Sequence, residues 1–129
     1  MNTSTQKFIA TDESVAAAAT EVDVTHFTSA QINTRHARTG ILTCYVKGAN
    51  AASSGNVTFS FACYDPLRAA WDTVAYLTVV CALNATTAVQ KSITFYPDMA
   101  KFKLLSIQNA DATHAATCNA SITMKETRA

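Results

Sequence analysis

Four cysteines and three histidines are the side chains in this sequence that could act as nucleophiles or metal ligands. The histidines stand in three separate segments, and none has a partner at the spacing of a metal-binding pair. The cysteines form no CxxC, and each lies in an apolar strand-like pattern, where a free cysteine packs as a small hydrophobic residue. We therefore expect reduced, buried thiols, no catalytic residue, no metal and no cofactor, although folding could still assemble a site from distant segments. The residues are His26, His36, His114, Cys44, Cys63, Cys81 and Cys118.

Four aspartates in or near turns are the next candidates, because paired carboxylates perform acid–base catalysis or bind calcium. Asp65 and Asp98 each stand next to a proline, where an aspartate side chain accepts backbone N–H groups of a turn. Asp72 and Asp111 complete the set, and no loop has the dense alternation of acidic ligands that calcium requires. Turn capping is therefore the expected role, and we expect that the protein is not an enzyme.

The segment "NTRHART" is the sharpest basic cluster of the chain, with Arg35, His36 and Arg38. Two arginines on a loop are most often a solvated surface. If the chain binds another protein, however, their forked guanidinium groups are suited to carboxylates of that partner. We therefore keep these three residues as candidate partner contacts.

Aromatic side chains offer a different chemistry, because planar rings on the surface of a β-sandwich can stack on sugar rings. The candidates are Tyr45, Tyr64, Tyr76 and Trp71, and their spacing does not place them on one patch. Trp71 opens a segment whose alternate positions become steadily apolar toward Cys81. Its indole is therefore expected to close one end of the core.

Composition and charge limit the classes of function. The chain has 129 residues, of which 49% are hydrophobic and only 15% charged, as in a single globular domain with a weakly charged surface. The formal net charge of +1 provides no field to attract nucleic acid or anionic lipid. No segment approaches the length of an apolar membrane span, and the first residues show no secretion signal. We expect synthesis in the cytosol, with no nucleic acid and no membrane as partner.

Period-two alternation of apolar and polar residues is the dominant pattern. It is clearest in "NVTFSFACYD" and in "TCNASITMKE". Short turns separate these two segments from six further strand-like segments, without a convincing helix. The chain is therefore predicted to be an all-β, antiparallel sandwich of about eight strands. The six further segments are Lys7–Thr11, Glu21–Phe27, Gly40–Lys47, Trp71–Leu83, Ala88–Tyr96 and Phe102–Asn109.

The same pattern predicts the domain organisation and the core. Residues 1–20 are expected to form an N-terminal arm, and residues 21–129 the β-sandwich domain. The arm is expected to be removable without unfolding the sandwich, because the clearest strands begin later. The core is expected to contain Phe59, Phe61, Leu77, Val79, Ile93, Ile107 and Ile122.

Two stretches of the sequence resemble a known class of protein. In "GNVTFSFACYDPLRAAWDTVAYLTVV", a strand that ends in an aromatic residue and Asp is followed by a loop and a Trp-Asp-Thr strand start. In "SITFYPDMAKFKLLSIQNADATHAATCNASITM", a Pro-Asp turn leads to a final alternating strand. Over roughly positions 40–125, the chain resembles small jelly-roll-like β-sandwich proteins of tailed-phage virions, especially capsid decoration or cement proteins.

The resemblance implies a non-enzymatic virion structural protein that binds the outer surface of a phage capsid and stabilises it. Its implied partners are the major capsid protein and further copies of the chain, commonly in a homotrimer. The implied location is the capsid exterior, after synthesis in the host cytoplasm. The same features leave open a phage tail or receptor-binding sandwich, or a carbohydrate-binding module.

Overall fold

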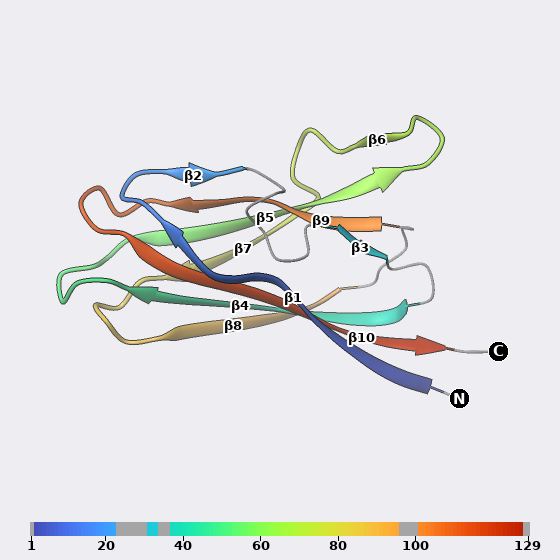
Figure 1. Ribbon diagram of the computed structural model, residues 1–129, viewed down its shortest axis with the longest axis horizontal. Helices are drawn as coiled ribbons and strands as arrows, with labels where there is room; N and C mark the ends of the chain where they lie inside the picture. The colour runs from blue at the N-terminus through green and yellow to red at the C-terminus, as the bar shows by residue number, and fades with distance from the viewer. Residues whose placement is uncertain (1, 23–30, 34–36, 96–100, 128–129) are drawn as a thin grey trace.

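Two antiparallel β-sheets form a sandwich in the computed structural model, which describes residues 2–22, 31–33, 37–95 and 101–127 (Figure 1). The first sheet has four strands in the order β1, β10, β4 and β8. Their bounds are β1 Asn2–Val15, β10 Ala116–Thr127, β4 Ala37–Gly48 and β8 Val89–Phe95.

The second sheet is built around β9 (Lys101–Asn109) and β5 (Asn56–Asp65), which pair with each other. On one side, β2 and β3 pair with different parts of β9 and so share one strand position. On the other side, β6 and β7 pair with different parts of β5. The short strands are β2 Thr20–Glu21, β3 Gln31–Asn33, β6 Ala70–Trp71 and β7 Leu77–Ala82.

The chain passes repeatedly from one sheet to the other, and its first and last strands lie side by side (Figure 1). With β2 and β3 counted together, and β6 and β7 counted together, the sheets have the orders β1-β10-β4-β8 and β2/β3-β9-β5-β6/β7. This is a jelly-roll arrangement of eight strand positions, which confirms the fold class predicted from the sequence. In the described part of the chain, no helix is long and apolar enough to cross a membrane.

The core lies between the two sheets, where alternate side chains of each strand point inward. The ring of Phe61 stacks on that of Phe102 across neighbouring strands, with 5.2 Å between the ring centroids. The predicted core is confirmed. Five of its members are at most 1% exposed, and the other two pack against them. The five are Phe59, Phe61, Val79, Ile107 and Ile122, and the other two are Leu77 and Ile93.

The first strand differs from the expectation of an N-terminal arm at residues 1–20. Residues 2–15 pair with β10 along its length, and Ile9 and Val15 are fully buried in the core. The pairing register shifts after Phe8 and again after Ala10, so apolar residues do not keep a strict period of two. The sequence pattern therefore shows only the part Lys7–Thr11 of a longer strand that belongs to the sandwich.

The segment predicted as one strand from Trp71 to Leu83 is divided in two. Only its first residue, Trp71, lies in the short strand β6, its later part forms β7, and residues 72–76 between them form no strand. The other predicted segment that differs is Glu21–Phe27, of which only the first residue lies in β2. Residues 23–27 of that segment lie outside the described residues.

The four cysteines are free in the structure. Cys44, Cys81 and Cys118 are buried in the core, and Cys63 is half-buried. Burial raises the pKa of all four thiols, that of Cys118 to about 12 and that of Cys63 to about 11. A raised pKa keeps a thiol protonated and poorly nucleophilic near neutral pH.

Candidate binding surfaces

The basic cluster predicted from the sequence lies mostly beyond the described residues. Arg35 and His36 are outside them, and Arg38 is the second residue of β4. The role of these three residues as partner contacts stays a prediction. His26 and Asp98 also lie outside the described residues.

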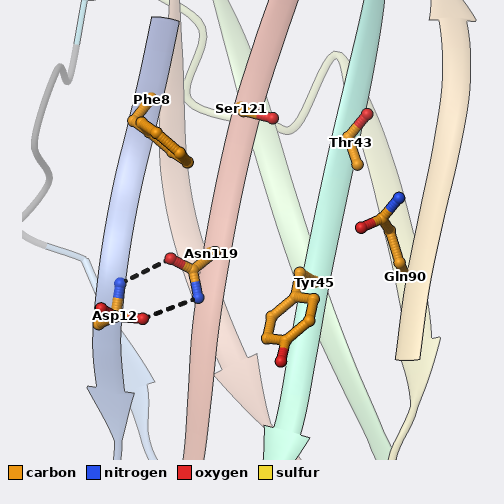
Figure 2. A pocket seen from close by; sticks show the side chains of 7 residues that line it. All are labelled: Phe8, Asp12, Thr43, Tyr45, Gln90, Asn119 and Ser121. Carbon is orange, nitrogen blue, oxygen red and sulfur yellow. Dashed lines mark hydrogen bonds between the residues drawn. The ribbon is translucent and has the colours of Figure 1, made fainter. Parts of the chain in front are cut away.

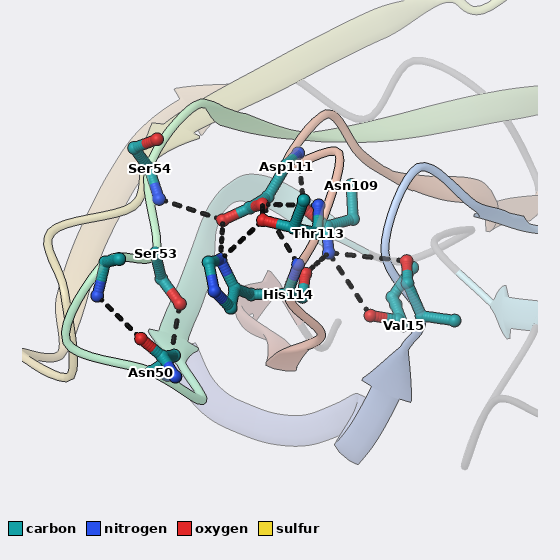
Figure 3. A network of polar contacts seen from close by, with 10 residues as sticks. Val15, Asn50, Ser53, Ser54, Asn109, Asp111, Thr113 and His114 are labelled. Carbon is teal, nitrogen blue, oxygen red and sulfur yellow. Dashed lines mark hydrogen bonds and ion pairs between the residues drawn. The ribbon is translucent and has the colours of Figure 1, made fainter.

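A buried carboxylate organises the loops at one end of the sandwich (Figure 3). Asp111 is 6% exposed, and its side chain accepts three backbone N–H groups at 2.9–3.0 Å. These hydrogen bonds, above all the one from Thr113, hold the pKa of Asp111 well below its ordinary value. The donors are Ser54, Thr113 and His114.

Asn109 extends this network to the loop that follows β1. Its side-chain Oδ1 accepts the N–H of Asp111 at 3.0 Å, and its Nδ2 lies 2.9 Å from the carbonyl oxygen of His114. The same Nδ2 lies 3.3 Å from the carbonyl oxygens of Val15 and Ala16. Three loops from different parts of the chain are thereby joined, and we call this set of contacts the loop network. Its polar groups form hydrogen bonds with one another, as is typical of a network that stabilises the fold.

The opposite end of β5 leads into a projecting segment, residues 66–76, which we call the excursion. It includes β6, which pairs with the end of β5, and the loops on either side of β6 project from the second sheet in Figure 1. Asp65 caps its first turn by accepting the N–H of Leu67 at 2.9 Å, as predicted for this aspartate. Three large apolar side chains of the excursion are exposed: Leu67 by 96%, Val74 by 79% and Tyr76 by 49%.

Trp71 does not close the core, so that prediction is wrong. Its indole is half-buried on the outside of the second sheet, where the ring of Tyr64 lies 5.2 Å away between centroids. The Nζ atom of Lys103 lies 4.6 Å from the centroid of the Trp71 ring, in a cation–π contact. The chain leaves the regular sheet directly after β6, so the alternation toward Cys81 does not continue back to Trp71.

A shallow groove of about 300 Å³ lies on the outward face of the first sheet (Figure 2). Residues from all four strands line it, because outward positions of β1, β10, β4 and β8 stand side by side in the register. One of these side chains is charged, and two are aromatic. The lining residues are Phe8, Asp12, Thr43, Tyr45, Gln90, Asn119 and Ser121.

Two pairs of hydrogen-bonded residues shape this groove. The side-chain Oδ1 of Asn119 accepts the backbone N–H of Asp12 at 2.8 Å, and its Nδ2 donates to the Asp12 carboxylate at 3.3 Å. Farther along the face, the hydroxyl groups of Thr43 and Ser92 are 2.8 Å apart. Of the aromatic candidates from the sequence, only Tyr45 lies here, and Phe8 was not among them.

The chemistry of the groove follows from these side chains. It presents hydroxyl, amide and carboxylate groups beside two aromatic rings, which suits a polar, uncharged ligand better than an anion. Elsewhere, among the residues that the structure describes, no three His, Cys, Asp or Glu side chains come together to hold a metal ion.

Comparison with known proteins defines the class of fold. No protein-family model matches the chain, and no curated protein matches it. A chain in the structure of infectious bursal disease virus, Gx strain, superimposes with a TM-score of 0.56 at 12% identity, over 97% of this chain and 32% of that chain. The VP2 subviral particle of infectious bursal disease virus gives a TM-score of 0.54 at 7% identity, with the same two coverages.

A xylan-binding domain, CBM22-1 of Xyn10C from Paenibacillus barcinonensis, is similar to nearly the same extent. Its TM-score is 0.53 at 11% identity, over 97% of this chain and 95% of that domain. At these identities the similarity concerns the fold alone. The chain is therefore a jelly-roll β-sandwich, of a kind found both in a viral particle and in a glycan-binding module.

Proposed function

We propose that this protein is a non-enzymatic virion structural protein that binds the outer surface of a phage capsid and stabilises it. The observation that carries the proposal is the excursion, where Leu67, Val74 and Tyr76 expose large apolar surfaces on one projecting segment. Several exposed apolar side chains on one short segment are typical of a contact with another protein. The resemblance to capsid decoration proteins supports the major capsid protein as that partner.

Other properties of the chain support the same role. Its low charge leaves a surface that is easily desolvated when it is buried against a shell. The jelly-roll fold is compatible with a structural role in a virion, since the VP2 subviral particle contains the same fold. In this proposal the chain docks as a homotrimer on the capsid exterior after synthesis in the host cytoplasm.

Stabilisation of the capsid follows from binding to the assembled state. A ligand that binds only that state shifts disassembly by about 2.7 kcal/mol per site when its concentration is a hundred times Kd. Each excursion exposes only a small apolar area. Burying that area contributes about 25 cal/mol of binding free energy per Å². Repetition over many equivalent capsid sites then makes a weak contact effective.

The test compares virions produced with and without the gene for this chain. Virions that lack it should release their genome at a lower temperature, and adding the purified chain should restore the wild-type release temperature. The double variant Leu67→Ser, Val74→Ser should fail to rebind. Val22→Ser is the matched control, because Val22 is 66% exposed but lies outside the excursion. Equal release temperatures, together with no rebinding of the wild-type chain, would reject the capsid role in favour of a tail or receptor-binding role.

A further inference from the structure

We infer that the groove on the outward face of the first sheet binds a neutral oligosaccharide of at least two linked sugar rings. This inference goes beyond the proposed function and does not depend on it, because the groove and the excursion lie on different sheets. Three features of the groove carry it: the spacing of its aromatic rings, its fixed polar groups and its charge.

The two aromatic rings are spaced for a ligand longer than one sugar ring. Phe8 lies on β1 and Tyr45 on β4, and β10 separates these strands. Two strand spacings place the two positions about 10 Å apart across the sheet. A single sugar ring cannot stack on both side chains at that separation, whereas two or more linked rings can. Phe8 is 57% exposed, so its ring is available to stack on the apolar C–H face of a sugar.

The polar groups between these rings are partly fixed in advance. The bulges of β1 bring Asp12 beside Asn119, which bonds both its backbone and its carboxylate. Asp12 has a φ of 47°, a left-handed conformation that costs free energy for a residue other than glycine. A strained residue held by a side-chain clamp at the wall of a groove is a typical feature of a preorganised binding site.

Other polar groups in the groove are available for a ligand. In the part of the chain that the structure describes, the side chains of Tyr45, Gln90 and Ser121 form no hydrogen bond. A phenol, an amide and a hydroxyl group offer both donors and acceptors. Sugar hydroxyl groups also donate and accept, so this set can bond several of them at once.

The charge of the groove distinguishes a neutral glycan from other polar ligands. Among the described residues, no lysine, arginine or histidine lines it, and Asp12 is the one charged residue of the lining. A phosphate, sulfate or carboxylate would meet no cation there and would be repelled by Asp12. Nucleic acid and acidic glycans are thereby disfavoured, whereas the Asp12 carboxylate can accept hydrogen bonds from sugar hydroxyl groups.

The experiment uses the full purified chain and a panel of linear hexasaccharides of glucose, xylose, mannose and N-acetylglucosamine. Each monosaccharide and one sulfated hexasaccharide complete the panel. Binding is measured by calorimetry and located by shifts of backbone amide NMR signals. We expect one or more neutral hexasaccharides to bind, each monosaccharide to bind at least tenfold more weakly, and the shifts to centre on Phe8, Tyr45 and Asn119.

Variants separate the groove from other aromatic surfaces. Tyr45→Ala should weaken binding at least tenfold, whereas Tyr76→Ala, an exposed tyrosine on the excursion, should leave it unchanged. Gln90→Ala provides a second groove variant with an exposed side chain, in case Tyr45→Ala does not fold.

Three results would overturn the inference: no neutral hexasaccharide binds at millimolar concentration, only the sulfated one binds, or the NMR shifts centre on Trp71. Retained affinity in a folded Tyr45→Ala or Gln90→Ala variant would overturn it as well. Loss of glycan binding leaves rebinding to virions unaffected, so this test and that of the capsid role fail independently.

Discussion

The two ends of strand β5 differ in how the chain beyond them is held. At the first end, the loop network joins three loops through Asp111 and Asn109, which are at most 6% exposed. At the other end, the excursion exposes Leu67 and Val74 almost fully. It is held by the contacts of Trp71 with Tyr64 and Lys103 and by hydrogen bonds such as that from the N–H of Tyr76 to the carbonyl oxygen of Phe61 at 2.8 Å. The difference is that buried polar contacts hold the loops at one end, while the other end exposes apolar side chains, which in the proposed function contact the capsid.

The largest expected loss of stability is in the core beside the excursion. Phe61 is fully buried and stacked on Phe102 where β5 approaches the excursion. Phe61→Ala should lower the free energy of unfolding by about 3–5 kcal/mol, because it removes a buried ring and leaves a cavity. Chemical denaturation measures this, and Phe8→Ala is the matched control. That exposed phenylalanine should cost less than about 1 kcal/mol. Similar losses for both variants would mean that the inward and outward faces of the strands are assigned wrongly.

The next largest loss of stability is expected when the loop network is disrupted. Asn109→Ala removes one acceptor and one donor group from a site that is 1% exposed, and leaves the N–H of Asp111 and nearby carbonyl groups without their partner. We expect a loss of about 2–3 kcal/mol, since each buried polar group left unsatisfied costs about 1–3 kcal/mol.

Asn50→Ala provides the comparison for this variant. Asn50 is exposed, and its side chain accepts one local N–H, from Ala52 at 2.9 Å. Its loss should cost less than about 1 kcal/mol by the same measurement. If Asn109→Ala costs no more than Asn50→Ala, the loop network does not stabilise this end of the molecule.

A smaller effect concerns the dependence of stability on pH. The pKa of Asp111 is lower in the folded than in the unfolded chain, so its contribution is fully present above its unfolded pKa of about 3.9 and decreases as pH falls below that value. Asp111→Asn should therefore be less stable than the wild type at pH 7. The difference in free energy of unfolding should narrow as pH falls from about 5 to about 3. A constant difference over that interval would show that the charge of Asp111 does not stabilise the network.

Regular strands could be predicted from the sequence, because their inward and outward positions alternate without interruption. The segments that form β5 and β10 are of this kind, and they fixed the fold class and most of the core. The same rule found only part of β1, because a bulge there places both Ile9 and Ala10 in the core. It failed at Trp71, because alternation within a segment does not reveal that the chain leaves the sheet between β6 and β7.

The binding surfaces were less accessible to sequence reasoning. Phe8, Asn119 and Tyr45 meet in the groove because β1, β10 and β4 are neighbours in a particular register, although these residues are far apart along the chain. Sequence spacing carries no information on that register. Two of the exposed apolar side chains of the excursion, Val74 and Tyr76, lie in the segment Trp71–Leu83, which the alternation assigned to a single strand. Their exposure became evident only with the break at residues 72–76.

The smallest expected effect is on stability at the excursion. Leu67 is 96% exposed, and only its backbone N–H is bonded, to Asp65. Leu67→Ser keeps that hydrogen bond and removes an isobutyl group that already lies in water. The free energy of unfolding should therefore change by less than about 0.5 kcal/mol, the usual range for a surface substitution. Rebinding to virions should nevertheless decrease, because the same group would be desolvated at the capsid surface. A loss of stability above about 1 kcal/mol would indicate that Leu67 packs within its own chain, and the contrast between the two ends of β5 would then fail.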